Sequence, residues 1–254
     1  MLSKQQLDTY HDDGIVFPVE VFSADEVLYF RAALEKLLVE FKDRTPKRLD
    51  GLHLFFPWAY RLVAHEKLLN IVEQILGHEI LVDGTLVFYK PAYDSSYVSW
   101  HQDSVYSTWH LTPSTSAWIA LTPSSRDNGC MRAIPGSHKQ GVLSHTNRQD
   151  KSNLLVRGEQ VATVDEANAL DVVLKPGEAS LHQSTLVHGS NSNSSDQPRI
   201  GFIVRFVTNQ IAKQERAVVR VRGSADCSHL TIARAPAEKD PQERFSAWRA
   251  FNNC

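Results

Sequence analysis

The residues of this chain that could bind a metal ion begin with His101 and Asp103, which lie two positions apart in the segment 99–103. That segment is predicted to be extended, and in a strand the side chains at positions i and i+2 point to the same face. An imidazole and a carboxylate would then form two adjacent corners of a metal site. A His-x-Asp triplet often arises by chance, so the interpretation depends on whether the chain offers a third ligand.

The natural third ligand is His188, which ends the β-prone segment 185–188. Two neutral imidazoles and one carboxylate form the facial triad that binds Fe(II) and leaves other coordination positions open. These ligand types suggest iron rather than zinc, although the spacing alone does not choose the metal. His182 competes with His188 for this role, because it also lies in a β-prone segment, six positions earlier.

Arg199 lies eleven positions after His188 and opens the otherwise apolar segment 199–206. A buried guanidinium without a partner is costly, and a carboxylate ligand bound through two parallel hydrogen bonds would satisfy it. Arg205 would share a face with Arg199 in a regular strand, so either arginine could bind such a ligand. We favour Arg199 because it lies at the strand end that faces the loop after His188. The alternative, that the arginine pairs with a local acid or faces solvent, is more reasonable for Arg205.

The first third of the chain is predicted to be mostly helical. Ser23 and Glu26 form a capping box, and apolar residues at helical spacing follow them to about Arg44. Further helices are expected over residues 3–13 and from about 65 to 76, with a loop over 45–58.

After Gly77 the sequence changes to short β-prone segments separated by turn residues. The predicted strands cover residues 79–90, 97–102, 115–122, 130–134, 170–174, 178–182, 185–188, 199–208 and 216–221. Short strands with this punctuation predict a sandwich or barrel. No linker is evident, so we expect one domain over 1–254: a mainly β core over about 78–222 with flanking helices, an N-terminal helical layer over about 1–77, and a C-terminal tail over 223–254 with one helix near 242–251.

The composition restricts the class of protein. The chain has 254 residues, of which 42% are hydrophobic, so a globular fold with a sizeable core is expected. A net charge of −2 shows no basic excess that would indicate a nucleic acid or an anionic membrane as partner. Three widely separated cysteines suit a reducing compartment. With no secretory signal and no apolar run long enough to span a bilayer, we expect a cytoplasmic protein; the sequence does not decide its oligomeric state.

Several short motifs follow one another in the second and third quarters of the chain. They are Tyr89-Lys90-Pro91, Trp100-His101-Gln102-Asp103, Trp118-Ile119-Ala120-Leu121, Asn128-Gly129-Cys130-Met131, Ile134-Pro135-Gly136-Ser137-His138-Lys139 and His188-Gly189-Ser190 with Arg199. In order and spacing they resemble the phytanoyl-CoA dioxygenase family over about residues 5–210. Members of that family are Fe(II)/2-oxoglutarate oxygenases with a double-stranded β-helix, a cupin-like jelly roll. The run 178–182 before His188 resembles in particular the bacterial branch of natural-product hydroxylases and halogenases.

The resemblance implies roles for six residues. His101, Asp103 and His188 would bind iron, and Arg199 would bind the distal carboxylate of 2-oxoglutarate. Ser190 would be a second contact to that co-substrate, and Trp118 would line its pocket. With Fe(II), 2-oxoglutarate and O2, the expected enzyme hydroxylates an unactivated C–H bond of a small molecule and releases succinate and CO2. The substrate would be a natural-product intermediate, an amino acid or a related metabolite.

Asp103 bears on the reaction, because halogenases of that branch have Ala or Gly at this position and thereby leave room for a halide. An aspartate therefore favours oxygen transfer. The same oxidant could also desaturate, cyclise or epimerise a substrate, and the sequence does not decide between these outcomes. An alternative of another class is a metal-binding cupin-type protein without 2-oxoglutarate chemistry, and a third hypothesis is a non-catalytic binding module.

Two groups of residues could contact the substrate. The aromatic loop 52–60, together with Trp100, Tyr106 and Trp109, could form a lid over the metal site or could simply pack the helical layer on the β core. Lys90, Arg126 and Arg132 could meet an anionic substrate, although exposed structural cations are the commoner use.

Overall fold

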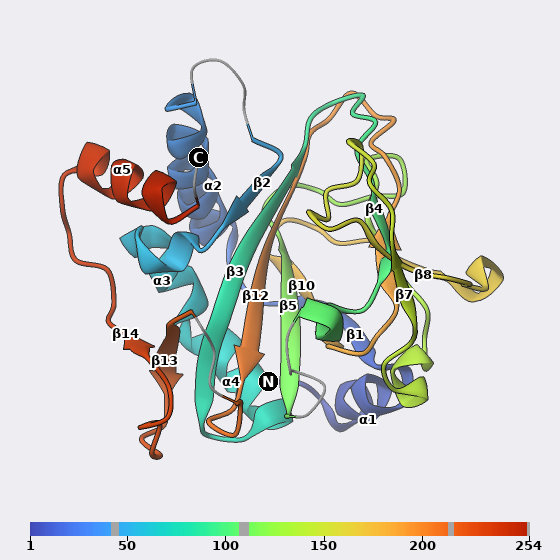
Figure 1. The fold of residues 1–254 in the computed structure, drawn as a ribbon, viewed down its shortest axis with the longest axis horizontal. Helices are drawn as coiled ribbons and strands as arrows, with labels where there is room; N and C mark the ends of the chain where they lie inside the picture. Colours follow the sequence, from blue (N-terminus) through green and yellow to red (C-terminus); the bar gives the residue numbers. More distant parts are fainter. Residues whose placement is uncertain (42–45, 107–111, 213–215, 253–254) are drawn as a thin grey trace.

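Two β-sheets form the centre of the molecule (Figure 1). The computed structural model describes residues 1–41, 46–106, 112–212 and 216–252. The larger sheet has eight strands and the smaller has four. The strands of the larger sheet are β1 (Ile15–Glu20), β2 (Arg48–Asp50), β3 (Ile80–Lys90), β5 (Ser114–Ala120), β10 (Glu178–Gln183), β12 (Arg199–Val207), β13 (Val218–Arg222) and β14 (Ile232–Ala233).

The smaller sheet faces the larger one. Its strands are β4 (Val98–His101), β6 (Met131–Ala133), β9 (Leu170–Val172) and β11 (His188–Ser190), and they pair in the order β4-β11-β6-β9. The chain therefore passes back and forth between the sheets, since β3, β5, β10 and β12 belong to one and β4, β6, β9 and β11 to the other. This alternation is the jelly-roll topology, so the expected double-stranded β-helix is confirmed.

The helices lie mostly before the β core and cover the larger sheet. They are α1 (Lys4–Asp13), α2 (Ala24–Val39), α3 (Pro57–Val63) and α4 (Glu66–Leu76), with α5 (Pro241–Phe251) near the C-terminus. Figure 1 shows α2, α3 and α5 on one side of β3 and β12, with β4 on the other. The capping box of α2 is present, because the Ser23 hydroxyl accepts from the Glu26 backbone and the Glu26 carboxylate accepts from the Ser23 N–H.

The prediction of a loop over residues 45–58 is partly wrong. It contains β2, a 3-10 turn η1 (Leu52–Leu54) and the start of α3, in which Pro57 takes the first helical position. β2 pairs with residues Leu86 to Phe88 of β3, and this long-range pairing stabilises a three-residue strand that local sequence cannot signal. Helix α2 ends at Val39, before the expected Arg44; residues 42–45 lie outside the described ranges.

Strand β12 shows how the sequence sorts residues between two interiors. Ile200, Phe202, Val204 and Phe206 pack in the core between the larger sheet and the helices. Ile203 belongs instead to the core between the two sheets, and Arg199 and Arg205 line a cavity on that same face. The period of two therefore turns both arginines toward the inside of the jelly roll.

The remaining elements are short. Strands β7 (His145–Asn147) and β8 (Glu159–Val161) form a separate two-stranded sheet, and the other 3-10 turns are η2 (Asp103–Tyr106), η4 (Ser137–Gln140) and η5 (Glu166–Asn168). The predicted C-terminal helix is confirmed as α5. Among the described residues, no helix is both long and apolar enough to cross a bilayer.

Candidate active site

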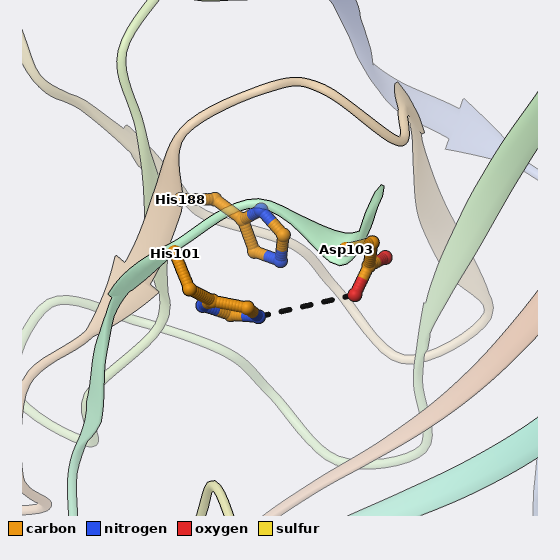
Figure 2. A group of neighbouring side chains, drawn as sticks. All are labelled: His101, Asp103 and His188. Carbon is orange, nitrogen blue, oxygen red and sulfur yellow. Dashed lines mark ion pairs between the residues drawn. The ribbon is translucent and has the colours of Figure 1, made fainter. Parts of the chain in front are cut away.

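His101, Asp103 and His188 come together inside the jelly roll. They form a group that could hold a metal ion, because their donor atoms all lie within 4.8 Å of one another, and all three residues are buried. Figure 2 shows the three side chains directed toward a common point, with His101 Nε2 3.8 Å from Asp103 Oδ1. The two histidines are partners in register across β4 and β11, and their ring centroids lie 4.3 Å apart.

The path of the chain through His101 and Asp103 differs from the expected strand. Strand β4 ends at His101, and Asp103 begins the 3-10 turn η2. The shared direction of the two side chains therefore comes from a strand-to-turn transition rather than from strand alternation. Gln102 stabilises this transition, because its buried side-chain amide donates to the carbonyls of Gly141 and Thr185 and accepts from the Leu143 N–H.

Backbone carbonyls fix the orientation of both imidazoles. His101 Nδ1 lies 2.9 Å from the Ser99 carbonyl oxygen, and His188 Nδ1 lies 3.0 Å from that of Leu186. A carbonyl only accepts, so each Nδ1 carries the proton and each Nε2 offers its lone pair. Burial lowers the pKa of His101 and, more strongly, that of His188, which keeps both rings neutral. A histidine that binds a metal ion through Nε2 is neutral and donates a hydrogen bond from Nδ1, and both imidazoles meet these conditions.

The carboxylate of Asp103 is held from the larger sheet. Ser116 Oγ on β5 donates to Asp103 Oδ2 at 2.7 Å, and Arg205 Nη2 on β12 lies 3.2 Å from Oδ1. Burial alone would raise the pKa of Asp103, but the Arg205 guanidinium and the neighbouring histidines hold it well below its usual value. Asp103 is therefore an anion, and the two neutral imidazoles with this carboxylate fit a divalent iron ion.

The structure places the two candidates for the third ligand differently. His182 lies on β10 in the larger sheet, with its ring centroid 4.7 Å from that of His188 and its Nε2 3.6 Å from Asp103 Oδ2. It is a neighbour of the three-residue group, which contains His188 rather than His182. The two strands that carry these histidines belong to different sheets, a fact that their spacing in the sequence could not show.

Arg199, Trp118 and Ser190 line the same cavity as His101, Asp103 and His188. The Arg199 side chain is 1% exposed, its Cζ lies 5.2 Å from the Trp118 ring centroid, and no described residue accepts a hydrogen bond from its Nε or Nη2. Burial lowers the pKa of Arg199 to about 10, so it keeps its positive charge at neutral pH. A buried cation with unsatisfied donors fits a carboxylate ligand.

Gly201 makes room for this arrangement. It lies between Arg199 and Ile203 on the inward face of β12, and a Cβ at this position would lie 2.1 Å from Cζ2 of Trp118. The absence of a side chain therefore lets the indole lie across β12 beside Arg199.

For Lys90 the sequence left open a contact with an anionic substrate or a role as an exposed structural cation, and its burial excludes the exposed role. This lysine is fully buried, is paired in register with Arg199, and donates to Ser190 Oγ at 2.7 Å. Burial, together with the nearby Arg199 charge, lowers the pKa of Lys90 to about 6. The sequence does show that Lys90 ends one β-prone segment and that Arg199 begins another. It does not show that these two strands pair, or in which register, so it could not place Lys90 beside Arg199.

The other substrate candidates are dispersed. Leu52, Phe55, Phe56, Trp58 and Tyr60 pack in or against the core beneath the helices, so most of this loop packs the helical layer, and His53 and Leu54 are the members that line the cavity. Arg132 stacks on Trp100 at 5.3 Å and, like Arg126, pairs with Asp171 outside the cavity. Trp109 and the side chain of Tyr106 lie outside the described residues.

The jelly roll, the His-Asp-His group and the buried arginine together define the class of Fe(II)/2-oxoglutarate dioxygenases. A family model described as "Phytanoyl-CoA dioxygenase (PhyH)" matches residues 10–201, and the chain belongs to this family. It is accordingly an Fe(II)/2-oxoglutarate-dependent dioxygenase that uses Fe(II), 2-oxoglutarate and O2.

Individual relatives agree with this assignment. The chain is 25% identical over 245 residues to an ectoine dioxygenase of Sphingopyxis alaskensis, covering 84% of this chain and 78% of that protein. It is 23% identical to a phytanoyl-CoA dioxygenase of Arabidopsis thaliana, covering 84% and 91%. Among solved structures, a non-heme monooxygenase, ThoJ, in its apo form is 30% identical with a TM-score of 0.82, covering 97% of this chain and 94% of that one.

Proposed function

We propose that His101, Asp103 and His188 bind the Fe(II) ion. The observation that carries this proposal is the juxtaposition, in one cavity, of three buried metal-binding groups and a buried arginine with unsatisfied donors. Three protein ligands leave coordination positions on the ion for other ligands.

The co-substrate is assigned to the inner end of the same cavity. Arg199 binds the distal carboxylate of 2-oxoglutarate through Nε and Nη2. Ser190, held by Lys90, is the second polar contact, and the Trp118 ring forms the adjoining wall. The support is chemical complementarity, since a dicarboxylate brings a negative charge to two buried cations and supplies the missing acceptors.

The reaction assigned to this site is hydroxylation of an unactivated C–H bond of a small molecule. When bound, Fe(II) with 2-oxoglutarate and O2 supplies the oxidising chemistry, with succinate and CO2 as products. The protein orients the co-substrate through Arg199 and Ser190 and keeps water out with the apolar residues between the sheets. Asp103 occupies the position where a halide would otherwise bind, which supports oxygen transfer over halogenation.

The wider setting is proposed as follows. The whole chain forms one oxygenase domain, with the helical layer over about 1–77, the core over about 78–222 and the tail over 223–254. The enzyme works in the cytoplasm. Its substrate is a small-molecule metabolite, since a net charge of −2 shows no basic excess that would attract a nucleic acid or an anionic membrane. The ectoine and phytanoyl-CoA dioxygenase relatives are named for small molecules.

The test is succinate formation from 2-oxoglutarate with Fe(II), with and without a metabolite mixture. Asp103→Ala and His188→Ala should each abolish it, while His78→Ala, at an exposed surface histidine, retains it. Arg199→Ala should raise the KM for 2-oxoglutarate by about 100-fold, because a charge-assisted pair with a buried carboxylate contributes about 3 kcal/mol. Full turnover in the first two variants, or an unchanged KM in the third, would contradict the assignment.

A further inference from the structure

The cavity extends well beyond the residues assigned to iron and 2-oxoglutarate. Its volume is about 780 Å³, toward the upper end of the roughly 300–1,000 Å³ typical of small-molecule sites. Its inner end is formed by buried residues such as Asp103 and Arg199, whereas its mouth is formed by exposed or half-buried residues, among them Arg157, Arg216 and Phe251. The mouth is the part left for the substrate.

Helix α5 forms one wall of the mouth. The Trp248 indole N–H donates to the Asp50 carbonyl oxygen at 2.7 Å, which anchors the helix on β2. This anchor places Phe251 against Phe55, with ring centroids 5.3 Å apart, and at the cavity lining. The C-terminal helix thus supplies an apolar surface next to the entrance.

Gly84 leaves open space in the wall of the cavity. It pairs in register with Arg205 across β3 and β12, and both residues line the cavity. A Cβ at Gly84 would meet no atom within 4 Å, and its φ is not in the left-handed region. The backbone conformation does not require glycine at this position. The effect of the missing side chain is open space beside Arg205.

The cavity carries an excess of positive charge. Five arginines line it against three aspartates, although the whole chain has a net charge of −2. Arg48 is occupied by Asp50, with N–O distances of 2.8 and 2.9 Å, and Arg205 by Asp103. Arg216 differs from these two, because its contact within the described residues is the Phe251 ring, 5.4 Å from its Cζ, and no acid pairs with it.

We propose that the substrate of this oxygenase carries an anionic group, a carboxylate or a phosphate ester, which Arg216 binds at the mouth of the cavity. The adjoining apolar part of the substrate packs on Phe251 and passes Gly84 to reach the metal-binding group. The direction of binding rests on the function proposed above, whereas the recognition of the anion does not depend on turnover. An arginine that is stacked on a ring is held in place for such a contact.

The experiment measures binding of three matched probes to the anaerobic Fe(II)–2-oxoglutarate enzyme by calorimetry: octanoate, octyl phosphate and the neutral octanamide. At least one anion should bind about tenfold more tightly than the amide, since a charge-assisted contact adds about 1.5 kcal/mol. The stronger of the two anions identifies the head group. Arg216→Gln should remove this preference, and Gly84→Leu should weaken all three probes by filling the open space beside Arg205.

Arg126→Gln is the matched control, because Arg126 is an exposed arginine that lies outside the cavity, and it should keep the preference. The affinity for 2-oxoglutarate is measured in every variant, so failure of the co-substrate site is distinguished from failure of the anion site. Equal affinity for the amide and the acids, no binding of either anion, or an unchanged preference in Arg216→Gln would each overturn the proposal.

Discussion

Two basic side chains, Lys90 and Arg199, lie buried side by side near the inner end of the cavity. Lys90 has a pKa lowered to about 6 by burial and by the nearby Arg199 charge, so it is largely neutral at pH 7 without a ligand. A bound carboxylate would favour the protonated ammonium and raise this pKa. Binding of 2-oxoglutarate at the proposed site beside Lys90 should therefore be coupled to uptake of a proton by this lysine.

This coupling predicts the pH dependence of co-substrate binding. The ligand-free lysine loses its proton above its lowered pKa, so the affinity for 2-oxoglutarate should fall about tenfold from pH 6 to pH 8. Lys90→Met should flatten this slope, while Lys139→Met, at a surface lysine, should not. The measurement is an anaerobic titration of the Fe(II)-saturated enzyme, followed by its visible charge-transfer band. A Lys90→Met enzyme with the parent slope would refute the coupling.

Among the secondary-structure elements, two adjacent strands of the larger sheet, β5 and β12, hold the Asp103 side chain, which lies in the turn that follows strand β4 of the smaller sheet. Ser116 on β5 and Arg205 on β12 are partners in register, and both contact the Asp103 carboxylate. Two neighbouring strands thus form a preformed site for one carboxylate, independent of the metal.

This site predicts the behaviour of an Asp103→Ala variant. Removing the carboxylate takes the counter-charge from a largely buried arginine, so the variant should lose about 3 kcal/mol of unfolding free energy. Sodium formate should restore part of this stability by occupying the vacated space, and should stabilise neither the parent protein nor Asp103→Leu, whose side chain fills that space. Thermal unfolding with and without formate measures the effect. Equal responses in the two variants would argue against a preformed carboxylate site.

For the whole molecule, the metal-binding group joins parts that are distant in the sequence. His101 and His188 belong to the smaller sheet, and Asp103 is bound to the larger sheet through Ser116 and Arg205. A metal ion held by all three residues would link the two halves of the jelly roll. It would bind the folded chain and not the unfolded one, and should stabilise it by mass action.

Cobalt(II), which resists oxidation by air, provides the test. At a free concentration about 100 times its Kd it should add about 2.7 kcal/mol, which corresponds to a rise in Tm of about 5–10 °C for a domain of this size. A chelator should reverse the rise. His188→Ala should not show it, whereas His78→Ala should show it in full. A Tm that cobalt leaves unchanged in the parent protein would speak against a metal held by these three residues.

Residue types and local elements can be interpreted from the amino-acid sequence alone. The capping box at Ser23 and Glu26, the change from helical to strand periodicity after Gly77, and the His-x-Asp motif depend on neighbouring residues, so they can be interpreted without a structure. Motif order added the family and the jelly roll. Arg199, opening an apolar strand, was identifiable as a buried cation because burial of an unsatisfied guanidinium is costly.

Which distant groups meet follows from the three-dimensional fold and not from local sequence. The grouping of His188, rather than His182, with His101 and Asp103 depends on which sheet each strand joins, and the pairing of Arg205 with Asp103 depends on the register of β12 against its neighbours. The same holds for the burial of Lys90 beside Arg199 and for the place of α5 at the cavity mouth. Strand pairing and register arise from contacts between residues far apart in the chain, and local sequence carries no information about such contacts beyond the face on which each side chain lies.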